Sequence, residues 1–247
     1  MMKKKVWGWV ATIFFTLVSI LFVTPILIVL MNSFKSKSYI SLETFKLPSE
    51  QSFVGLQNYA EAISKYEFVK AVGWTLFITV FSVAVILICC SMTAWFITRV
   101  ENVVTKIIYL LCVFSMVIPF QMVMFTLSGT ADSLHLNTPW GIIIVYLGFG
   151  AGLAVFMFCG FVKSIPLEVE EAAMIDGCTP LQTFFKVVLP MMKPTYISVG
   201  ILEAMWIWND FLLPYLVLDI KKYKTISIVV QYMKGSYGRV DMGAIMA

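Results

Sequence analysis

The sequence predicts an all-α polytopic membrane protein. Sixty per cent of the 247 residues are hydrophobic and 13% are charged, and the mean hydropathy is +0.89, whereas about half of the residues of a soluble domain are apolar. Several uninterrupted apolar runs are long enough to cross the hydrocarbon core of a bilayer, for which about 20 helical residues suffice. We therefore expect a single transmembrane domain over residues 1–247.

Four uncharged runs have the required length, and a fifth is interrupted by two acidic residues. The first run follows three lysines, as the core of a signal peptide would, but it is about twice as long as such a core, which indicates a retained span. In the fourth run, Gly148, Gly150 and Gly152 would allow a neighbouring helix to approach closely. The expected spans cover residues 6–34, 71–98, 107–131, 136–162 and 195–218.

Polar segments separate these runs. Residues 35–70 predict a loop followed by a short surface helix, because the apolar residues of the second half have helical spacing. The net charge of +4 is scattered along the chain, which gives no indication of a nucleic-acid partner. The five cysteines lack the spacing of a metal site, so we expect no metal ligands. His135 lies in a polar turn and is expected at the surface.

Residues 163–194 predict two short helices joined by a glycine elbow outside the bilayer. Gly177 stops the first helix, since glycine adopts the left-handed conformation of a helix end without steric cost. Thr179 and Gln182 form the capping box that starts the second helix. Leu189 and Pro190 are expected to end it before the fifth span begins.

The first of these short helices carries clustered acids and paired alanines. Glu168, Glu170 and Glu171 fall in its first turns, where the helix dipole favours carboxylates. Ala172 and Ala173 make one flank small enough for another protein to approach, and the Glu171 carboxylate suits an arginine fork. We interpret the segment as a protrusion that docks into a groove of a partner. The alternative is an amphipathic surface hairpin with solvated acids.

The same segment resembles the EAA loop of the permeases of ATP-binding-cassette (ABC) importers. The pattern consists of Glu171-Ala172-Ala173, Asp176-Gly177 and Leu189-Pro190. Its flanks, "FVKSIPLEVEEAAMIDG" and "TFFKVVLP", resemble the carbohydrate-uptake branch that includes the maltose-type permeases. So do "NYAEAI", "GWTLFIT" and "WNDFLLPYL", and the similarity extends from about residue 10 to the C-terminus.

The resemblance implies a type I ABC-importer permease-like helical bundle and a binding-protein-dependent sugar importer that works by alternating access. A separate ATPase would dock at the loop, with its basic residue on Glu171, and Leu189 and Pro190 would pass the movement to the fifth span. The implied ATPase-coupling residues are Glu171, Ala172, Ala173, Asp176, Gly177, Leu189 and Pro190.

The implied partners are a second permease subunit in a heterodimer, two copies of the ATPase, an extracytoplasmic sugar-binding protein and membrane lipid, without nucleic acid. No phosphate-binding loop of the G-x-x-x-x-G-K-[ST] type occurs in the sequence. The chain is therefore expected to bind no cofactor and to catalyse no reaction, while the partner ATPase binds ATP and Mg²⁺.

Orientation follows from the resemblance, because charge counting does not decide it. Eight of the 18 basic residues would be inside if the N-terminus is cytoplasmic, which gives the positive-inside rule no support. In the family the EAA loop, here residues 163–194, is cytoplasmic, so we expect a cytoplasmic N-terminus in a prokaryotic plasma membrane. Residues 219–242 would then be an extracytoplasmic loop, with Gly235, Ser236 and Tyr237 contacting the sugar-binding protein.

The family pattern also includes a further span. The final residues, "DMGAIMA", look like its beginning, so we expect five complete spans plus the start of a sixth in a piece of a longer chain.

The fifth span contains ionisable residues that suggest a path for the sugar. Glu203 and Asp210 are seven residues apart and share a helical face, and such groups inside a membrane usually face the protein interior or a water-filled path. Pro214 is a plausible hinge. The path candidates are Glu203, Trp206, Trp208, Asn209 and Asp210.

Three alternatives remain open for these residues. Asn209 and Asp210 could cap a broken helix or bond a neighbouring span. The chain could also be a proton-coupled secondary carrier, or an intramembrane enzyme, in which Glu203 and Asp210 are the working acids.

Overall fold

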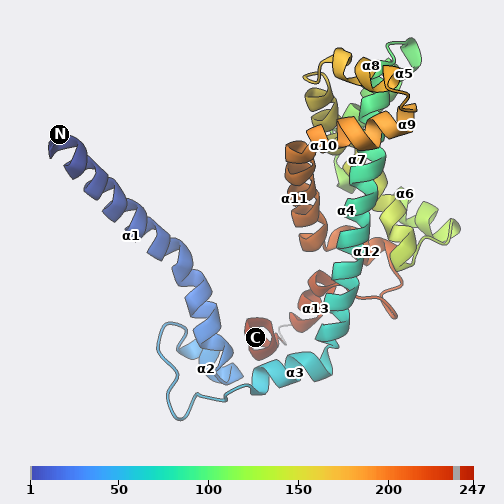
Figure 1. The fold of residues 1–247 in the computed structure, drawn as a ribbon. Coiled ribbons are helices and arrows are strands. Elements are labelled where there is room, and N and C mark those ends of the chain that lie inside the picture. Colours follow the sequence, from blue (N-terminus) through green and yellow to red (C-terminus); the bar gives the residue numbers. More distant parts are fainter. Residues whose placement is uncertain (1, 236–239) are drawn as a thin grey trace. The chain divides into compact units, whose positions relative to one another are not determined.

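The computed structural model describes residues 2–235 and 240–247, and these residues form helices without any strand beyond an isolated bridge between Lys35 and Phe53. The chain divides into two compact units. Unit 1 comprises Met1–Val69 and Val229–Ala247, and unit 2 comprises Lys70–Ile228. Figure 1 shows the helices, with α13 (Ile226–Met233) running across the sequence boundary between the units.

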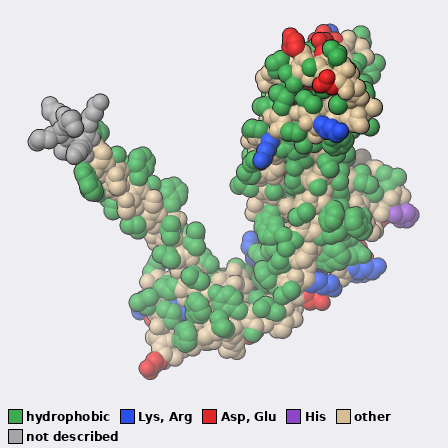
Figure 2. Space-filling view, viewed as in Figure 1, with side chains coloured by type: hydrophobic (Ala, Val, Ile, Leu, Met, Phe, Trp, Pro, Cys, Tyr) green, Lys and Arg blue, Asp and Glu red, His purple; other side chains and the backbone are tan. Residues whose placement is uncertain are grey.

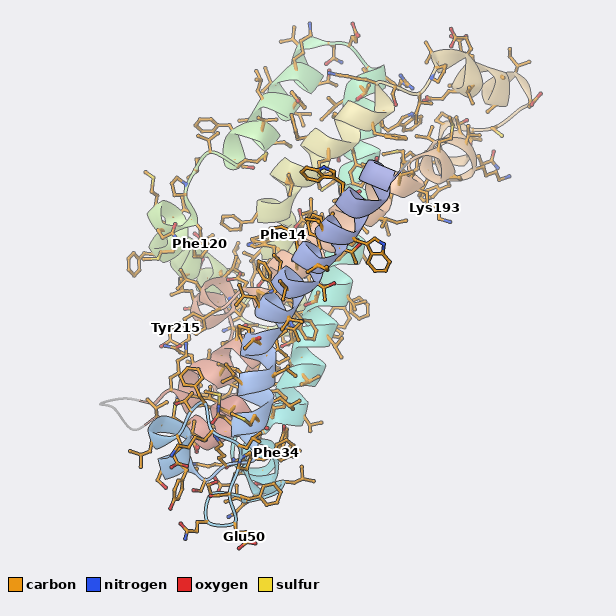
Figure 3. The ribbon with its side chains drawn as sticks, turned by 90° about the vertical axis from the view of Figure 1, so that its left-hand side faces the viewer. Phe14, Phe34, Glu50, Phe120, Lys193 and Tyr215 are labelled. Atoms are coloured by element: carbon orange, nitrogen blue, oxygen red, sulfur yellow. The ribbon has the colours of Figure 1, made fainter. Side chains whose placement is uncertain are left out.

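Unit 1 contains one long apolar helix, three short helices and the last residues of α13. The long helix, α1, covers Met2–Ser33, and its most apolar stretch has a mean hydropathy of 2.8 with no residue buried. Figure 3 shows side chains such as Phe14 projecting from it along its length. The short helices are α2 (Lys37–Leu42), α3 (Gln57–Lys65) and α14 (Met242–Met246), and α14 packs against the other three helices of the unit. The exposed side chains of α1 are those of a helix that faces lipid or other helices in a membrane.

A buried lysine holds the loop after α2 to the end of α1. The Lys35 Nζ donates to Asn32 Oδ1 at 3.0 Å and to the backbone oxygens of Glu43 at 2.7 Å and Lys46 at 2.5 Å. Burial lowers the pKa of the Lys35 ammonium below its ordinary value, against the opposing charge of Glu43. The three acceptors compensate for the loss of water around the ammonium.

The C-terminal helix is fixed by a carboxylate with four donors. Asp241 Oδ1 accepts the backbone N–H of Ala244 and lies 3.2 Å from Lys37 Nζ. Its Oδ2 accepts from Tyr66 at 3.1 Å and from Lys65 at 3.3 Å. Burial opposes ionisation of Asp241, but the hydrogen bonds from these four groups outweigh it and hold the pKa of the carboxyl below its usual value.

Unit 2 is built around α7 (Pro139–Val162). More than half of the residues of this helix are buried. The helices α5 (Val103–Ser115) and α11 (Lys193–Asn209) pack against α7, and α12 (Leu212–Val217) packs against α6 (Phe120–Ser133). The long helix α4 (Phe68–Arg99) completes the apolar core, which includes Ile86, Tyr146 and Phe158.

Among the described residues, three continuous helices are long and apolar enough to cross a membrane: Trp7–Ser33, Phe68–Arg99 and Pro139–Val162. The number reaches five if two bent helix pairs each count as one span. The expected span over 107–131 is one of these pairs, because α5 and α6 meet at 106°. Pro119 explains the break, since its ring removes a backbone donor and disfavours a helical conformation at the preceding residue.

The fifth span also differs from the expected single helix over 195–218. Helix α11 ends at Asn209, and α12 begins at Leu212, so the break lies at Asp210 rather than at the expected hinge, Pro214. Pro214 is in the first turn of α12, where its missing N–H costs no intrahelical hydrogen bond. The Asp210 backbone is extended, with ψ of 130°. Asp210 accepts the N–H groups of Leu212 and Leu213 and the O–H of Tyr146 on α7, so the alternative of capping a broken helix or bonding a neighbouring span is confirmed for Asp210. Among the described residues, the Asn209 side chain bonds only Met205 of its own helix.

The segment over 219–242 is not simply a loop, because it contains α13. Gly235 follows this helix with φ of +63°, the left-handed conformation of a turn. Ser236 and Tyr237, two of the three residues proposed to contact the binding protein, lie outside the described residues.

Candidate functional site

The segment between the fourth and fifth spans forms one end of unit 2 (Figure 1). It consists of α8 (Leu167–Ile175), α9 (Pro180–Thr183), a π-helical turn η1 (Phe184–Val188) and α10 (Leu189–Met191). The expected arrangement of a helix, an elbow and a second helix is present.

The elbow is a Schellman motif at the end of α8. The Cys178 N–H donates to the Ala173 oxygen and the Gly177 N–H donates to the Met174 oxygen, both at 3.0 Å. This pattern requires a left-handed residue after the helix, and Gly177 has φ of +86°. The sequence prediction for Gly177 is confirmed.

The capping box at the start of α9 is also present. Thr179 N–H donates to Gln182 Oε1 at 2.9 Å, and Gln182 N–H donates to Thr179 Oγ1 at 3.4 Å. Pro180 occupies the first helical position, where its missing N–H costs no helical hydrogen bond.

The second helix ends at Met191, one residue after Pro190, so the expectation that Leu189 and Pro190 end it is confirmed within the usual uncertainty of a helix boundary. It runs through η1 and then bends by 78° into α11. Pro190 has no N–H to offer the oxygen of Lys186, four residues earlier. The helix widens into a π turn, in which Leu189 N–H donates to the oxygen of Phe184, five residues earlier.

The outward side of this end carries both acidic and apolar side chains. Glu171, Ala172, Asp176 and Gly177 are exposed and Ala173 is half-buried. Figure 2 shows acidic side chains at this end among hydrophobic ones. We define the α8 surface as Glu171, Ala172, Met174, Ile175, Asp176 and Leu181.

The apolar members of the α8 surface were not anticipated from the sequence. Ile175 is 85% exposed and Leu181 is 57% exposed. The signal that could have identified them is the presence of large apolar side chains in a segment expected outside the bilayer. Grouped beside Ala172 and Glu171, they have the composition of a protein-binding patch.

The neighbouring acid, Glu170, points the opposite way and is buried. Its Oε1 accepts from Arg99 Nε at 2.9 Å and Nη2 at 2.7 Å, and its Oε2 accepts from Trp95 Nε1 at 2.9 Å. Arg99 Nη2 also donates to the backbone oxygens of Ile165 at 2.9 Å and Val162 at 3.3 Å. Sequence reasoning gave Glu170 only a helix-dipole role, because these partners are far away in the chain.

At the break in the fifth span, the side chains of Tyr146, Trp206 and Asp210 lie together. Tyr146 O–H donates to Asp210 Oδ2 at 3.1 Å, and its ring meets the Trp206 ring edge-to-face at a centroid distance of 5.5 Å. Asp210 Oδ1 caps α12 by accepting the N–H groups of Leu212 at 3.0 Å and Leu213 at 3.4 Å. Tyr146 was not among the sequence candidates, since it lies on another span.

The remaining candidates do not join this cluster. Glu203 is buried against α7 at Gly150, and its Oε2 has no hydrogen-bond partner among the described residues. Trp208 is exposed and lies about 200° around the helix from Trp206. Asn209 is exposed and donates to the Met205 oxygen of its own helix. Within the part of the chain that the structure describes, no group of three His, Cys, Asp or Glu residues could hold a metal ion.

Comparisons with known proteins place this arrangement among transport systems. The family described as "Binding-protein-dependent transport system inner membrane component" matches residues 87–236. The "Probable starch degradation products transport system permease protein AmyC" of Thermoanaerobacterium thermosulfurigenes is 38% identical over 237 residues, which cover 96% of this chain and 85% of that protein.

A second relative and a solved structure agree with this match. The "Multiple sugar-binding transport system permease protein MsmG" of Streptococcus mutans is 33% identical over 83% of this chain and 73% of its own length. The crystal structure of a bacterial ABC transporter for the import of the acidic polysaccharide alginate has a chain with the same fold. Its TM-score is 0.80 at 20% identity, covering all of this chain and 90% of that one.

Proposed function

Because the chain belongs to the family of binding-protein-dependent transport system inner membrane components, we propose that it carries an oligosaccharide and that a separate ATPase drives it through the α8 surface. The chain is a multi-pass protein of a prokaryotic plasma membrane and a transport subunit, not an enzyme. The observation that carries the proposal is a patch of exposed apolar and acidic residues on the helical hairpin between α7 and α11.

An oligosaccharide is the favoured substrate because of the relatives' names, which mention starch degradation products and multiple sugars. Within the cluster, Trp206 is 41% exposed and Asp210 is partly exposed, which suits such a ligand, whereas Tyr146 is buried and holds Asp210 in place. Aromatic faces contact the C–H side of a sugar ring, and a carboxylate accepts hydrogen bonds from its hydroxyl groups. Glu203, Trp208 and Asn209 remain proposed path residues on the same helix.

The α8 surface suits a groove in the ATPase that is apolar at its base and basic at its edge. Fully burying a side chain such as Ile175 is worth about 1.5–3 kcal/mol, whereas an ion pair at the rim of an interface contributes about 0–1 kcal/mol. We therefore assign most of the affinity to Ile175 and Leu181, and orientation in the groove to Glu171. Ala172 and Ala173 allow the groove wall to come close to the helix.

The proposed cycle uses the partners that the family description implies. A sugar-loaded binding protein docks outside, two ATPase copies close on ATP, and their movement through α8 opens the path of this chain and a second permease in a heterodimer. ATP and Mg²⁺ are bound by the ATPase, and this chain binds no cofactor. Gly235, Ser236 and Tyr237 are proposed to contact the binding protein.

The need for ATP fixes the proposed orientation. The α8 surface must face the cytoplasm, where ATP is found. Four spans separate the N-terminus from α8, so the N-terminus is cytoplasmic as well, and residues 219–242 are extracytoplasmic.

Gentle purification of the tagged full-length chain from membranes that contain its neighbours tests the docking. We expect the parent to retain an ATPase and a second permease. Glu171→Lys should lose the ATPase and keep the permease, because it would place like charges against each other at the basic edge of the groove, which costs several kcal/mol. Glu101→Lys is the matched control, since it makes the same charge change at an exposed residue of the short link after α4. A parent chain that purifies without either partner would contradict the proposed function.

A further inference from the structure

Adjacent carboxylates of α8 face opposite environments. Glu171 is exposed on the α8 surface, whereas Glu170 is 1% exposed and directed into unit 2. Both oxygens of Glu170 are paired, one with the forked guanidinium of Arg99 and the other with the Trp95 indole. A helix that needed only a solvated acid in its first turn would not require three donors from a distant span.

Arg99 is a junction of three helices. Its side chain comes from the last turn of α4, binds Glu170 of α8, and donates to the oxygen of Val162, the last residue of α7, and to that of Ile165 in the following turn. The positive charge is favourable there because the helix dipole leaves negative charge on the last carbonyl groups. Only a planar, multiply donating guanidinium can serve all these acceptors, so a lysine would not replace it.

Trp95 extends the same contact to the second half of the hairpin. It lies one turn before Arg99 on α4, and its ring packs against the buried Phe184 of η1 at a centroid distance of 5.4 Å. Thus α4 holds α8 through polar contacts and η1 through an aromatic contact. We define Trp95, Arg99, Glu170 and Phe184 as the α4 clamp.

We propose that the α4 clamp passes movement of the α8 surface into α4 and α7, so that Arg99 and Glu170 are positioning residues for coupling. This inference rests on the proposed docking of an ATPase at α8. The α4 clamp would be a second route for the movement. The first route runs along the backbone, from the hairpin through Leu189 and the bend at Met192 into α11. When α8 shifts, Arg99 and Trp95 are expected to move with the buried Glu170 carboxylate. Separating them would leave an uncompensated buried charge, which is unfavourable.

The experiment measures sugar uptake per ATP hydrolysed in proteoliposomes that contain the full-length chain, the second permease, the ATPase and the binding protein. A maltooligosaccharide mixture is the probe. Glu170→Gln keeps the side-chain volume and removes the charge that Arg99 binds, while Arg99→Lys keeps the charge and removes the fork. Glu168→Gln makes the same chemical change at an exposed position of the same helix.

We expect Glu170→Gln and Arg99→Lys to retain the ATPase and to lower uptake per ATP about fivefold or more, whereas Glu168→Gln behaves as the parent. Unchanged uptake per ATP in the two clamp variants, with only a lower yield of folded chain, would show a purely structural role and overturn the inference. A parent that retains no ATPase would overturn the proposed function, and this inference with it.

If the single variants Glu170→Gln and Arg99→Lys misfold, a double variant still tests the inference. Replacing a buried ion pair by apolar residues of similar size usually preserves stability, so Arg99→Met combined with Glu170→Met is expected to fold. The inference requires this folded variant to hydrolyse ATP with reduced uptake. Parent-like uptake per ATP in the double variant would overturn it.

Discussion

Gly152 is a position where α7 lies close against α5, and its replacement by alanine should loosen that contact. An added Cβ would lie 2.5 Å from Met116 Cγ, 2.8 Å from Ser115 Oγ and 2.8 Å from the Cys112 backbone oxygen. The methionine and serine side chains can rotate, but the carbonyl oxygen cannot move without shifting α5. The predicted role of these glycines in packing is confirmed at Gly152.

The size of the effect follows from a comparison with Gly148, four residues earlier on α7. A Cβ at Gly148 would meet nothing within 4 Å. Both substitutions gain the same helix propensity, about 1 kcal/mol, which cancels in their difference. Overpacking costs about 1–3 kcal/mol, so Gly152→Ala should be less stable than Gly148→Ala by that amount.

Reversible unfolding of the purified chain in a titration of denaturing against mild detergent measures this difference. We expect Gly148→Ala to unfold at or above the denaturant fraction of the parent, and Gly152→Ala to unfold at a lower one. Equal stability of the two variants would refute the reasoning, because it would mean that α5 yields without cost.

Further predictions concern the hairpin and the C-terminal helix. Gly177→Ala should cost about 1–2 kcal/mol through left-handed strain alone, as nothing lies within 4 Å of its Cβ, and Gly177→Asn should recover part of this stability in thermal unfolding. Thr179→Ala should cost about 1 kcal/mol by removing the capping box, and faster amide exchange in α9 would report it. Asp241 has a lowered pKa, so its stabilising contribution is present above the ordinary aspartate pKa and lost as pH falls through the lower folded value. The parent should therefore be more stable than Asp241→Asn at pH 7, and this difference should shrink as the pH falls below the ordinary aspartate pKa. A difference that does not change with pH would contradict the prediction.

The parts of the hairpin that the sequence predicted are those determined by near neighbours. Thr179 and Gln182 are three residues apart, and Gly177 ends a helix whose last turn it follows directly. Such features depend on backbone groups within one helical turn. They can therefore be recognised without knowledge of the tertiary fold.

The features that were not predicted are of two kinds. Some depend on residues far apart in the sequence, and others on whether a proline breaks a helix or widens one of its turns. Glu170 and Arg99 are 71 residues apart, and nothing near Glu170 indicates that it is buried while Glu171 is exposed. Tyr146 joins Asp210 from another span for the same reason. Pro119 and Pro190 were visible signals, but whether a proline breaks a helix or widens it into a π turn depends on the surrounding packing.

The most direct measurement is sugar uptake by proteoliposomes that contain the full-length chain with its second permease and ATPase, with the binding protein and labelled maltooligosaccharides outside. We predict uptake that requires internal ATP and the binding protein and that persists when an uncoupler abolishes the proton gradient. Uptake that survives without ATP and collapses with the uncoupler would contradict the account, and would instead indicate a proton-coupled carrier in which Glu203 and Asp210 are the working acids.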